Sequence, residues 1–350
     1  MNSFGNIFRL TSFGESHGPA VGGVIDGVPA GLVIGRDAVE AYMARRRPGA
    51  PGVSPRREAD TVEFLSGLMA CDESGAVTGA LTPENRLMVT LGTPVGFIVR
   101  NTDARPADYA RLGTVYRPSH ADYAWQCKYG LRDWRGGGRA SGRETVSRVV
   151  AGAVAAGVLA TVGVEVSARV VAVGGQTDQS CFAECLRRAA AQADSVGGIV
   201  ECRATGVPAG WGEPSFGKLQ QMLAGAMLSI GGVKGFEYGD GFAMASATGS
   251  QANDPMRAGR DGEVCFCSNH SGGIQGGISN GQEIVMRVAF KPTPTIGMAQ
   301  HTVDAAGRDV VLEAGGRHDP CVAVRGAVVV EAMAAMVLCD AMLMSRGARL

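Results

Sequence analysis

The amino-acid sequence predicts a mixed α+β fold in which antiparallel sheets pack against long helices. The segments with strand patterns are short and closely spaced, whereas the longest apolar segments have the length of helices. No G-x-G-x-x-G motif follows a strand with an acidic residue about 20 residues later, so the dinucleotide fingerprint of a parallel βαβ fold is absent. At 350 residues the chain has the length of one large domain or two ordinary ones.

The first half of the chain combines short strands with two clear helices. Residues 36–47 (RDAVEAYMARRR) predict a helix, because apolar residues recur at helical spacing and the final arginines suit the helix dipole. Residues 147–163 predict a second helix, which is apolar on most faces and therefore buried. The expected strands of this half are 5–13, 22–25, 61–66 and 87–101.

The second half predicts a similar series of elements. The expected strands are 164–174 and 285–290, and the expected helices are 176–195, 216–230 and 322–343. GGIVECRATGVPAG (197–210) resembles GGVIDGVPAG (22–31) with an insertion, and SNHSGGIQGGISNG (268–281) resembles ESHGPAVGGVIDG (15–27). We therefore expect an internal duplication, although glycine-rich sequences match one another easily.

Composition excludes several functions. Lys and Arg total 33 and Asp and Glu total 33, so the net charge is zero, which argues against bulk binding to nucleic acid or an acidic membrane. The nine cysteines include no C-x-x-C pair, so they predict reduced thiols. The N-terminus lacks a signal-peptide core, and the longest uncharged apolar run, Val149 to Val164, is shorter than the roughly 18 residues of a membrane span. We expect a soluble, cytoplasmic protein.

Residues 117–153 hold the densest cluster of functional groups. This stretch contains His120, six arginines and the three successive glycines 136–138, and it runs into the apolar helix. Backbone N–H groups in a glycine loop before a helix N-terminus suit an anion, and arginines add bidentate donors for phosphate or carboxylate. The alternative is a flexible surface loop with solvated arginines, and composition alone does not decide between the two.

Two of the five histidines predict acid–base chemistry. His17 and His120 lie in Gly/Ser turns with acidic neighbours, and imidazole titrates near neutral pH. No H-x-x-x-H or H-E-x-x-H spacing occurs, so no metal site is expected. Asp319 in GRHDP (316–320) is a candidate base or a turn residue, and KPTPTI (291–296) suits a phosphate or a flavin edge. The residues alone therefore predict an enzyme that binds polyanions.

Three long stretches resemble the signature regions of the chorismate synthase family: GESHGPAVGGVIDGVP (14–29), GGGRASGRETVSRVVAGA (136–153) and RHDPCVAVRGAVVVEAM (317–333). Further matches are RRRPG (45–49), HADYAWQCKYGLRDWRGGGR (120–139), SNHSGGIQGGISNGQE (268–283) and KPTPTI (291–296). The matches cover the chain in order, so the resemblance implies a single domain, 1–350. It also implies a β-α-β sandwich, with a helical layer between two antiparallel sheets, and a homotetramer.

The family converts 5-enolpyruvylshikimate 3-phosphate to chorismate in the shikimate pathway of aromatic amino acid biosynthesis. The reaction is a 1,4-elimination of phosphate that needs reduced FMN without net redox change. Substrate and FMN together carry two phosphates and two carboxylates, which accounts for the clustered arginines. The resemblance admits NADPH as the reductant of the flavin. Because the sequence shows no extra domain for this step, we expect an external flavin reductase.

The resemblance also implies roles for individual residues. By motif, His17 protonates the departing phosphate, His120 tunes or protonates the reduced flavin near N1, and Asp319 assists proton handling at flavin N5. The implied substrate ligands are Arg46, Arg117 and Arg143, and Arg46 also belongs to an implied NADP site. The implied FMN contacts are Arg139, Ala140, Ser141, Gly231, Gly232, Gly276, Lys291, Pro292, Thr293, Pro294, Thr295 and Arg317.

The chain departs from the family pattern at three places. Ala140 stands where a serine is usual, and Gly142 where alanine is usual, so one hydroxyl contact is missing. Ser119 replaces a usual glycine. Residues 50–55 (APGVSP) lack the usual basic residue, which weakens an NADPH site built on Arg46.

Two other functional classes remain open from the sequence. One is a flavin oxidoreductase in which the same pocket performs net electron transfer. The other is a phosphate- or RNA-binding module that uses the basic loops. The neutral charge and the lack of aromatic residues along a basic face argue against this second class.

Overall fold

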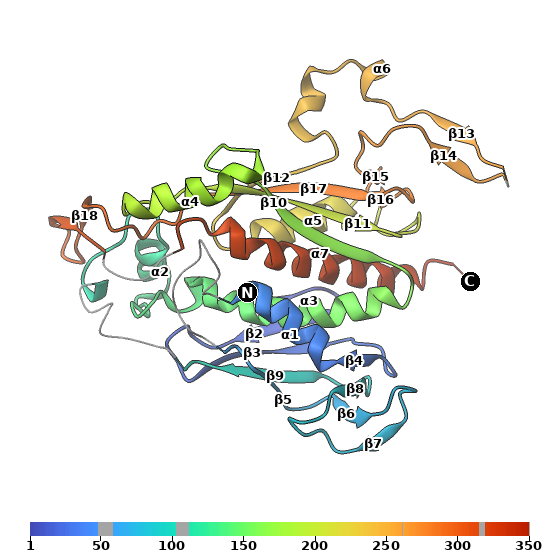
Figure 1. Ribbon diagram of the computed structural model, residues 1–350, viewed down its shortest axis with the longest axis horizontal. Coiled ribbons are helices and arrows are strands. Elements are labelled where there is room, and N and C mark those ends of the chain that lie inside the picture. The colour runs from blue at the N-terminus through green and yellow to red at the C-terminus, as the bar shows by residue number, and fades with distance from the viewer. Residues whose placement is uncertain (48–58, 103–111, 261, 315–318, 350) are drawn as a thin grey trace.

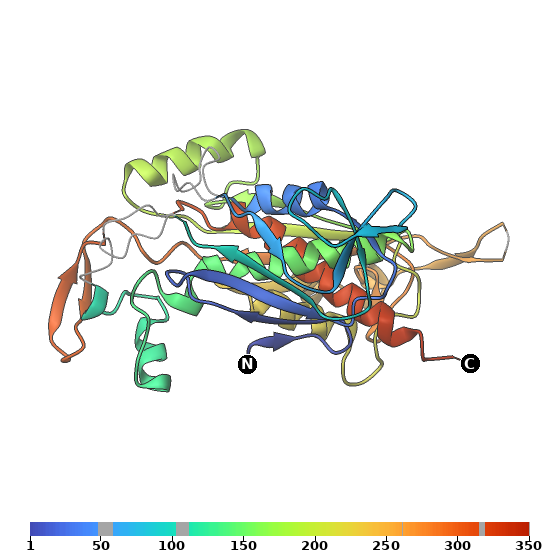
Figure 2. The same ribbon diagram turned by 90° about the horizontal axis from the view of Figure 1, so that it is seen from below.

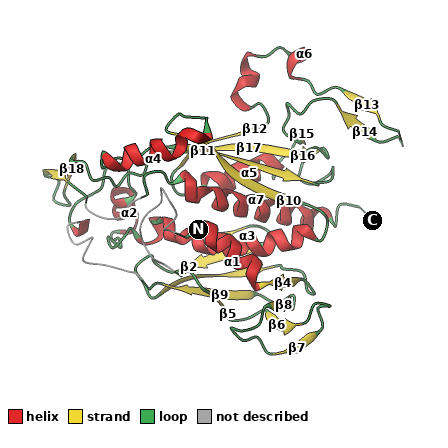
Figure 3. Ribbon diagram, viewed as in Figure 1, coloured by secondary structure: helices red, strands yellow, loops and turns green. Residues whose placement is uncertain are grey.

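The computed structural model describes residues 1–47, 59–102, 112–260, 262–314 and 319–349. Figure 1 shows helices packed between two sheets, and Figure 3 shows the same layers coloured by secondary structure. The helices of this layer are α1 (Arg36–Arg46), α3 (Thr145–Ala160), α5 (Leu219–Leu228) and α7 (Ala323–Ser345). The expectation of a mixed α+β fold with antiparallel sheets is confirmed.

Each of the two large sheets is antiparallel. The first has the order β1-β2-β3-β9-β5, with the bounds Ser3–Phe4, Arg9–Phe13, Ala20–Asp26, Val95–Arg100 and Val62–Phe64. The second has the order β10-β11-β17-β12, with the bounds Glu165–Val173, Gly198–Thr205, Ile284–Phe290 and Val233–Tyr238. Burial alternates along β17, from buried Ile284 to buried Phe290, because one face of the strand packs on the helices.

The two halves of the chain repeat one series of elements. With further elements inserted between them, two strands, a helix, two strands and a helix occur in this order as β2, β3, α1, β5, β9 and α3, and again as β10, β11, α5, β12, β17 and α7. The corresponding strands also have the same spatial order, β2-β3-β9-β5 and β10-β11-β17-β12. The sequence GVPAG follows β3 and β11, and its first glycine, Gly27 or Gly206, has φ of 74° in both halves.

The topology supports only one of the two expected sequence repeats. The match between 22–31 and 197–210 aligns β3 with β11, and the turn that follows β3 with the turn that follows β11. The match between 15–27 and 268–281 was wrong, because 268–281 contains the small hairpin of β15 (Ile274–Gln275) and β16 (Ile278–Ser279). The false match arose from glycines, which both segments need for turns of positive φ.

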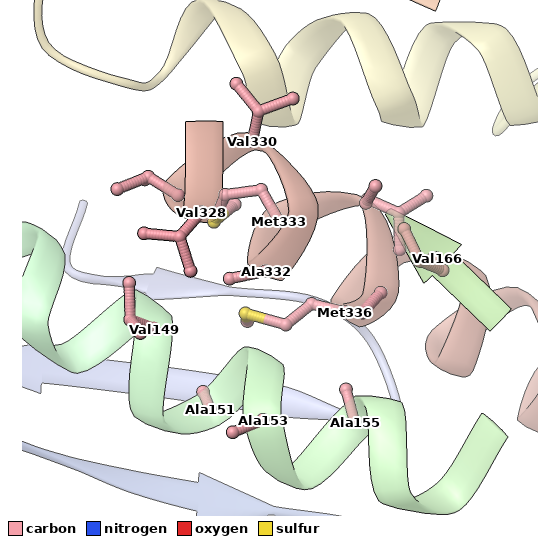
Figure 4. Close-up of a cluster of buried hydrophobic side chains, with 14 of the residues drawn as sticks. Val149, Ala151, Ala153, Ala155, Val166, Val328, Val330, Ala332, Met333 and Met336 are labelled. Carbon is pink, nitrogen blue, oxygen red and sulfur yellow. The ribbon is translucent and has the colours of Figure 1, made fainter. Parts of the chain in front are cut away.

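The core is centred on the contact between α3 and α7, which Figure 4 shows. Small residues such as Ala151 and Ala155 let the two helices approach closely, and a Cβ on Gly152 would lie 2.2 Å from Cβ of Ala332. Within the described residues, α7 is the one helix long and apolar enough to span a membrane, but 89% of its apolar window is buried inside the protein. Its apolarity is therefore explained by its place in the core.

Smaller elements surround these layers. A third sheet has the order β4-β8-β6-β7, with the bounds Val33–Gly35, Leu87–Thr90, Leu68–Cys71 and Val77–Gly79. The remaining elements are α2 (Asp122–Tyr129), α4 (Phe182–Ala191), α6 (Gly249–Ala252), β13 (Met256–Ala258), β14 (Val264–Phe266), β18 (Gln300–Val303) and β19 (Asp309–Leu312). Figure 2 shows α2 and the β18–β19 hairpin at one end of the molecule, opposite the C-terminus.

Candidate active site

The glycine triplet 136–138 lies between the two predicted catalytic histidines. All three glycines have positive φ, 65°, 88° and 53°, a region that suits glycine. A Cβ on the first would lie 2.2 Å from Cε1 of His17, and a Cβ on the second 3.0 Å from Cε1 of His120. A Cβ on the third would lie 2.5 Å from Oε2 of Glu15. The absence of side chains on the triplet therefore lets His17 and His120 approach one loop from two segments.

His17 is held in a tight turn. The N–H of Gly18 donates to the carbonyl of Glu15 at 3.0 Å, which closes the turn around Ser16 and His17. The hydroxyl of buried Ser16 lies 3.1 Å from Nδ1 of His17. Burial raises the pKa of the neighbouring Glu15, and the charge of Arg139 partly offsets this shift. The turn thus presents an imidazole whose orientation is set by a hydroxyl and by the glycine loop.

His120 is anchored through a carboxylate, Asp122, that sequence reasoning did not select. Nδ1 of His120 lies 3.0 Å from Oδ1 of Asp122, and Arg117 donates to both oxygens of this carboxylate at 2.8 Å. Burial lowers the pKa of His120, and the hydrogen bond to Asp122 only partly offsets this shift. In the neutral ring, a proton on Nδ1 donated to Asp122 leaves Nε2 as a proton acceptor.

Asp122 itself stays ionised despite its burial. Burial alone would raise its pKa, but the hydrogen bonds from Arg117 and His120 outweigh burial and hold the pKa well below the usual range. Arg117 is 5% exposed and Asp122 is 3% exposed, so their charges interact with little screening by water. The guanidinium of Arg117 is therefore fixed in place beside His120.

Asp60 joins the other two predicted substrate arginines. Arg46 donates to its Oδ2 and Arg143 donates to its Oδ1. Burial lowers the pKa of Arg46 to about 10, although the charge of Asp60 opposes this shift. Burial would raise the pKa of Asp60, but the two arginines together lower it. One carboxylate thus holds two buried guanidinium groups close together, and guanidinium groups are the usual ligands of phosphate and carboxylate.

Asp319 connects this arginine pair to the second half of the chain. Its Oδ2 accepts a hydrogen bond from Arg325 at 2.9 Å, and Arg325 also donates to the backbone carbonyl of Arg46 at 2.7 Å. The hydroxyl of Thr293 donates to the backbone carbonyl of Asp319 at 2.7 Å. Asp319 therefore lies between the segment 291–295 and the helix α1, as a residue of a shared site would.

The predicted FMN contacts come together in part. The ammonium of Lys291 donates to the carbonyl of Ser119, beside His120, and the backbone N–H of Lys291 donates to the carbonyl of Gly232 at 2.9 Å. Gly276 does not join them, because it lies in the exposed turn between β15 and β16, which Figure 1 shows well away from α2. Arg317 and the loop 50–55 lie outside the described residues.

A cavity of about 510 Å³ opens beside the triplet, and its lining includes Glu15, Trp125, Arg132, Arg139 and Ala140. This volume falls in the range of about 300–1,000 Å³ that is usual for ligand sites. Nη2 of Arg139 donates to Ser12, whereas its buried Nη1 has no hydrogen-bond partner among the described residues. A buried guanidinium N–H without an acceptor is costly, so this site fits the phosphate of a cofactor. Ala140 lines the cavity without supplying the hydroxyl usual in the family.

A second cavity, of about 590 Å³, lies apart from the predicted site residues. Its lining includes Tyr42, Arg45 and the buried Glu331 of α7. Both oxygens of Glu331 accept hydrogen bonds from Arg45 at 2.7 Å, and one also accepts from the N–H of Ala168. Because these partners satisfy the buried carboxylate, we explain the cluster as structural and place the chemistry at the glycine triplet.

Sequence reasoning missed three residues that organise the site: Asp60, Asp122 and Asn101. Asp122 stands in the motif HAD, two residues after His120, and this spacing was a usable signal for a histidine–carboxylate pair. Asp60 and Asn101 have no local signal, because each meets its arginine only through the fold. Their recognition needs three-dimensional contacts.

The arrangement, buried arginines held by carboxylates beside two oriented histidines, has the chemistry of an enzyme site for an anionic ligand. The family model of chorismate synthase matches residues 8–343 of the chain. Chorismate synthases of Porphyromonas gingivalis and Caulobacter vibrioides are 49% and 46% identical to it, over 100% and 99% of this chain and 97% and 96% of theirs. A crystal structure of chorismate synthase superposes with a TM-score of 0.73 at 28% identity, covering 98% of this chain and 94% of that chain. The chain belongs to the chorismate synthase family.

Proposed function

We propose that the chain converts 5-enolpyruvylshikimate 3-phosphate to chorismate and phosphate by 1,4-elimination. The observation that carries this proposal is a continuous series of contacts among motifs far apart in sequence. Its first part leads from His17 across the glycine triplet to His120, whose neighbour Ser119 accepts a hydrogen bond from Lys291. Its second part begins at Thr293, two residues after Lys291, and returns to the turn of His17 through Asp319, Arg325, Arg46, Asp60, Arg143 and Asn101.

The buried arginines suit the charges of this substrate, a phosphate and two carboxylates. Arg46, Arg117 and Arg143 are at most 7% exposed, so their hydrogen bonds to a bound anion would be strong. Asp60 and Asp122 fix the guanidinium groups before the substrate arrives, and no reorganisation is then needed during the reaction. We infer that these three arginines hold the substrate anions.

The elimination breaks a ring C–H bond and the C–O bond to phosphate. The electron pair of the C–H bond forms a new double bond, the allylic double bond shifts, and the electron pair of the C–O bond leaves with the phosphate. The ring proton released is passed on by the groups on the flavin side of the site, which include Asp319. His17 donates a proton to the departing phosphate, for which the hydroxyl of Ser16 and the glycine triplet orient its ring. His120, kept neutral by burial, accepts or holds a proton at Nε2 while Asp122 binds Nδ1. Asp319, held by Arg325, assists proton handling at the flavin.

Reduced FMN supplies, when bound, electron density to the allylic system and recovers it, so the reaction has no net redox change. The residues that would hold it are Arg139, Ala140, Ser141, Gly231, Gly232 and the segment 291–295. The adjoining cavity, and the buried Nη1 of Arg139 that finds no acceptor in the part of the chain that the structure describes, support a phosphate-bearing cofactor there. We further infer a single β-α-β sandwich domain that arose by duplication, a cytoplasmic homotetramer, and reduction of the flavin by an external reductase.

Substitution of His17 tests the proton assignment. His17→Ala should lower turnover by about 10²–10⁴-fold, because it removes a general acid, and should leave FMN affinity nearly unchanged. The matched control is His270→Ala, which removes a half-exposed histidine that pairs with Asp240 at 2.6 Å, in a turn outside the contact series. Normal turnover of the His17 variant would exclude His17 as the acid.

An anaerobic assay with photoreduced FMN tests the reaction class. The proposed lyase raises the absorbance of chorismate while the flavin remains reduced at the end of the reaction. A flavin oxidoreductase would instead oxidise FMN in step with product. Adding NADPH in place of photoreduction then tests whether the chain needs an external reductase, because flavin would remain oxidised without one.

A further inference from the structure

We propose that Asn101 is a positioning residue for the elimination, which holds the turn of His17 and the guanidinium of Arg143 in a fixed relation. This inference rests on the proposed function of the same site. Asn101 directly follows β9, and its backbone N–H donates to the carbonyl of Pro19 at 3.1 Å, at the start of β3. The pairing of β3 with β9 therefore places the side chain of Asn101 beside the turn that carries His17.

The amide of Asn101 makes a complete set of hydrogen bonds across the site. Its Nδ2 donates to the carbonyls of Glu15 at 3.0 Å and Gly18 at 2.8 Å, the first and last residues of the His17 turn. Its Oδ1 accepts a hydrogen bond from Nε of Arg143 at 2.9 Å. One side chain thus binds both ends of the acid's turn and one of the anion-binding groups.

These contacts require an amide. Two donors and one acceptor in a side chain of this length occur only in asparagine. Aspartate has nearly the same shape, but its oxygens would face the two carbonyls of the turn and repel them, while its charge would keep the contact with Arg143. Asn101→Asp therefore breaks the hold on the turn alone, and Asn101→Ala breaks both contacts.

Both substitutions should lower turnover at saturating substrate. Asn101→Asp should lower kcat by about 10–100-fold, because a catalytic group displaced by about 1 Å loses rate of that order. It should also weaken substrate binding, because the added carboxylate offsets the positive charge of Arg143, so kcat at saturating substrate is the readout of positioning. Asn101→Ala should lower both kcat and substrate affinity. Asn269→Asp is the matched control, because its amide also binds backbone groups, of Glu283 and Gly273, outside the contact series.

A double-mutant cycle with His17→Ala separates positioning from a general structural role. If Asn101 acts through His17, Asn101→Asp should change the rate of the His17→Ala protein by no more than about twofold. If Asn101→Asp lowers kcat of the His17→Ala protein by the same factor as it lowers kcat of the parent, the proposal is wrong. Because Asn101→Asp places a charge in the site, denaturation midpoints verify its folding, and Asn101→Ala replaces it in the cycle if it does not fold.

An NMR titration of ¹³C-labelled histidine supplies a readout that does not depend on turnover. The Cε1 resonance that disappears in His17→Ala belongs to His17, and its shift or pKa should change in Asn101→Asp but not in Asn269→Asp. An unchanged His17 resonance together with an unchanged kcat would refute the positioning role. Failure of the proposed function has a different signature, since the parent protein would then form no chorismate while the resonance of His17 still responded to Asn101→Asp.

Discussion

At the scale of single residues, Gly137 is constrained both by its backbone and by its surroundings. Its φ is 88°, and a Cβ would lie 3.0 Å from Cε1 of His120. We expect Gly137→Ala to lower the free energy of unfolding by about 1–2 kcal/mol, through left-handed backbone strain. It should also lower kcat by about 10–100-fold, because the added methyl group displaces His120. Denaturant titration and chorismate formation measure the two effects.

Gly31 provides the control for this prediction, because it shares the backbone conformation but not the neighbour. Its φ is 85°, and nothing lies within 4 Å of a Cβ at this position. Gly31→Ala should therefore lose similar stability without loss of kcat. If both variants keep full activity, the triplet serves the backbone turn alone and does not position His120.

Also at this scale, the sequence indicated the candidate chemical groups more clearly than the residues that hold them. His17, His120 and the arginines stand in long motifs, and the structure brings them together through the triplet and Asp60. Asp60 was not predictable, because its partners Arg46 and Arg143 lie at distant positions that meet only in the fold. Gly276 was expected among the flavin contacts, but a glycine has no side chain whose chemistry can indicate its neighbours.

At the scale of elements, the buried Asp340 of α7 fastens the N-terminal segment to the core. Its carboxylate accepts hydrogen bonds from the backbone N–H groups of Asn6, Ile7 and Phe8, at 2.8, 2.7 and 3.0 Å. Asp340→Ala should lower the free energy of unfolding by about 2–4 kcal/mol, because it leaves these donors without an acceptor. The denaturation midpoint measures the loss, and hydrogen exchange at residues 6–8 locates it.

The conservative variant Asp340→Asn gives the control for that prediction. It keeps one carbonyl oxygen as an acceptor, so its loss of stability should be smaller than that of Asp340→Ala. Equal losses in the two variants would mean that the negative charge, rather than the set of hydrogen bonds, fastens the segment. Activity should be measured at low temperature, where both proteins remain folded.

Elements with a strong apolar pattern were predictable, and short ones were not. The helices expected at 147–163 and 322–343 are confirmed as α3 and α7, because burial in the central layer requires an apolar surface on most faces. The helix expected at 36–47 is confirmed as α1, which is mostly polar but buries Val39 and Met43 at helical spacing. The helix expected at 216–230 begins only at Leu219. The hairpins β13–β14 and β18–β19 were missed, because strands of three or four residues have too few side chains to show an alternation.

At the scale of the whole molecule, the two repeated halves meet at the candidate site. Lys291 contacts the carbonyl of Ser119, and Arg325 contacts the carbonyl of Arg46, so each contact joins the second half to the first. The repeat was visible in the sequence only where GVPAG follows a strand, because turns of positive φ preserve glycines while core positions accept any apolar residue of fitting size. The two halves thus share a topology, but they contribute different residues to the one candidate site.

This placement predicts positive coupling between the two ligands of the site. FMN and substrate are both polyanions, and charge repulsion alone would make each weaken the other. However, the expected flavin contacts lie on both halves, at 139–141 and at 231–232 and 291–295, while the proposed substrate ligands Arg46, Arg117 and Arg143 lie on the first half. The two halves contact each other through Lys291 and Arg325. A ligand that orders one half should therefore also order the residues that bind the second ligand.

We therefore expect substrate to tighten FMN binding by about 5–150-fold, the usual range of coupling between two sites, and FMN to tighten substrate binding by the same factor. Titration of FMN fluorescence with and without substrate measures the first factor, and calorimetry of substrate binding with and without FMN measures the second. Inorganic phosphate in place of substrate is the control, because it supplies an anion without the ring that spans the site. If substrate weakens FMN binding or leaves it unchanged, repulsion between the anions outweighs the shared surface, and the two ligands do not occupy one site as proposed.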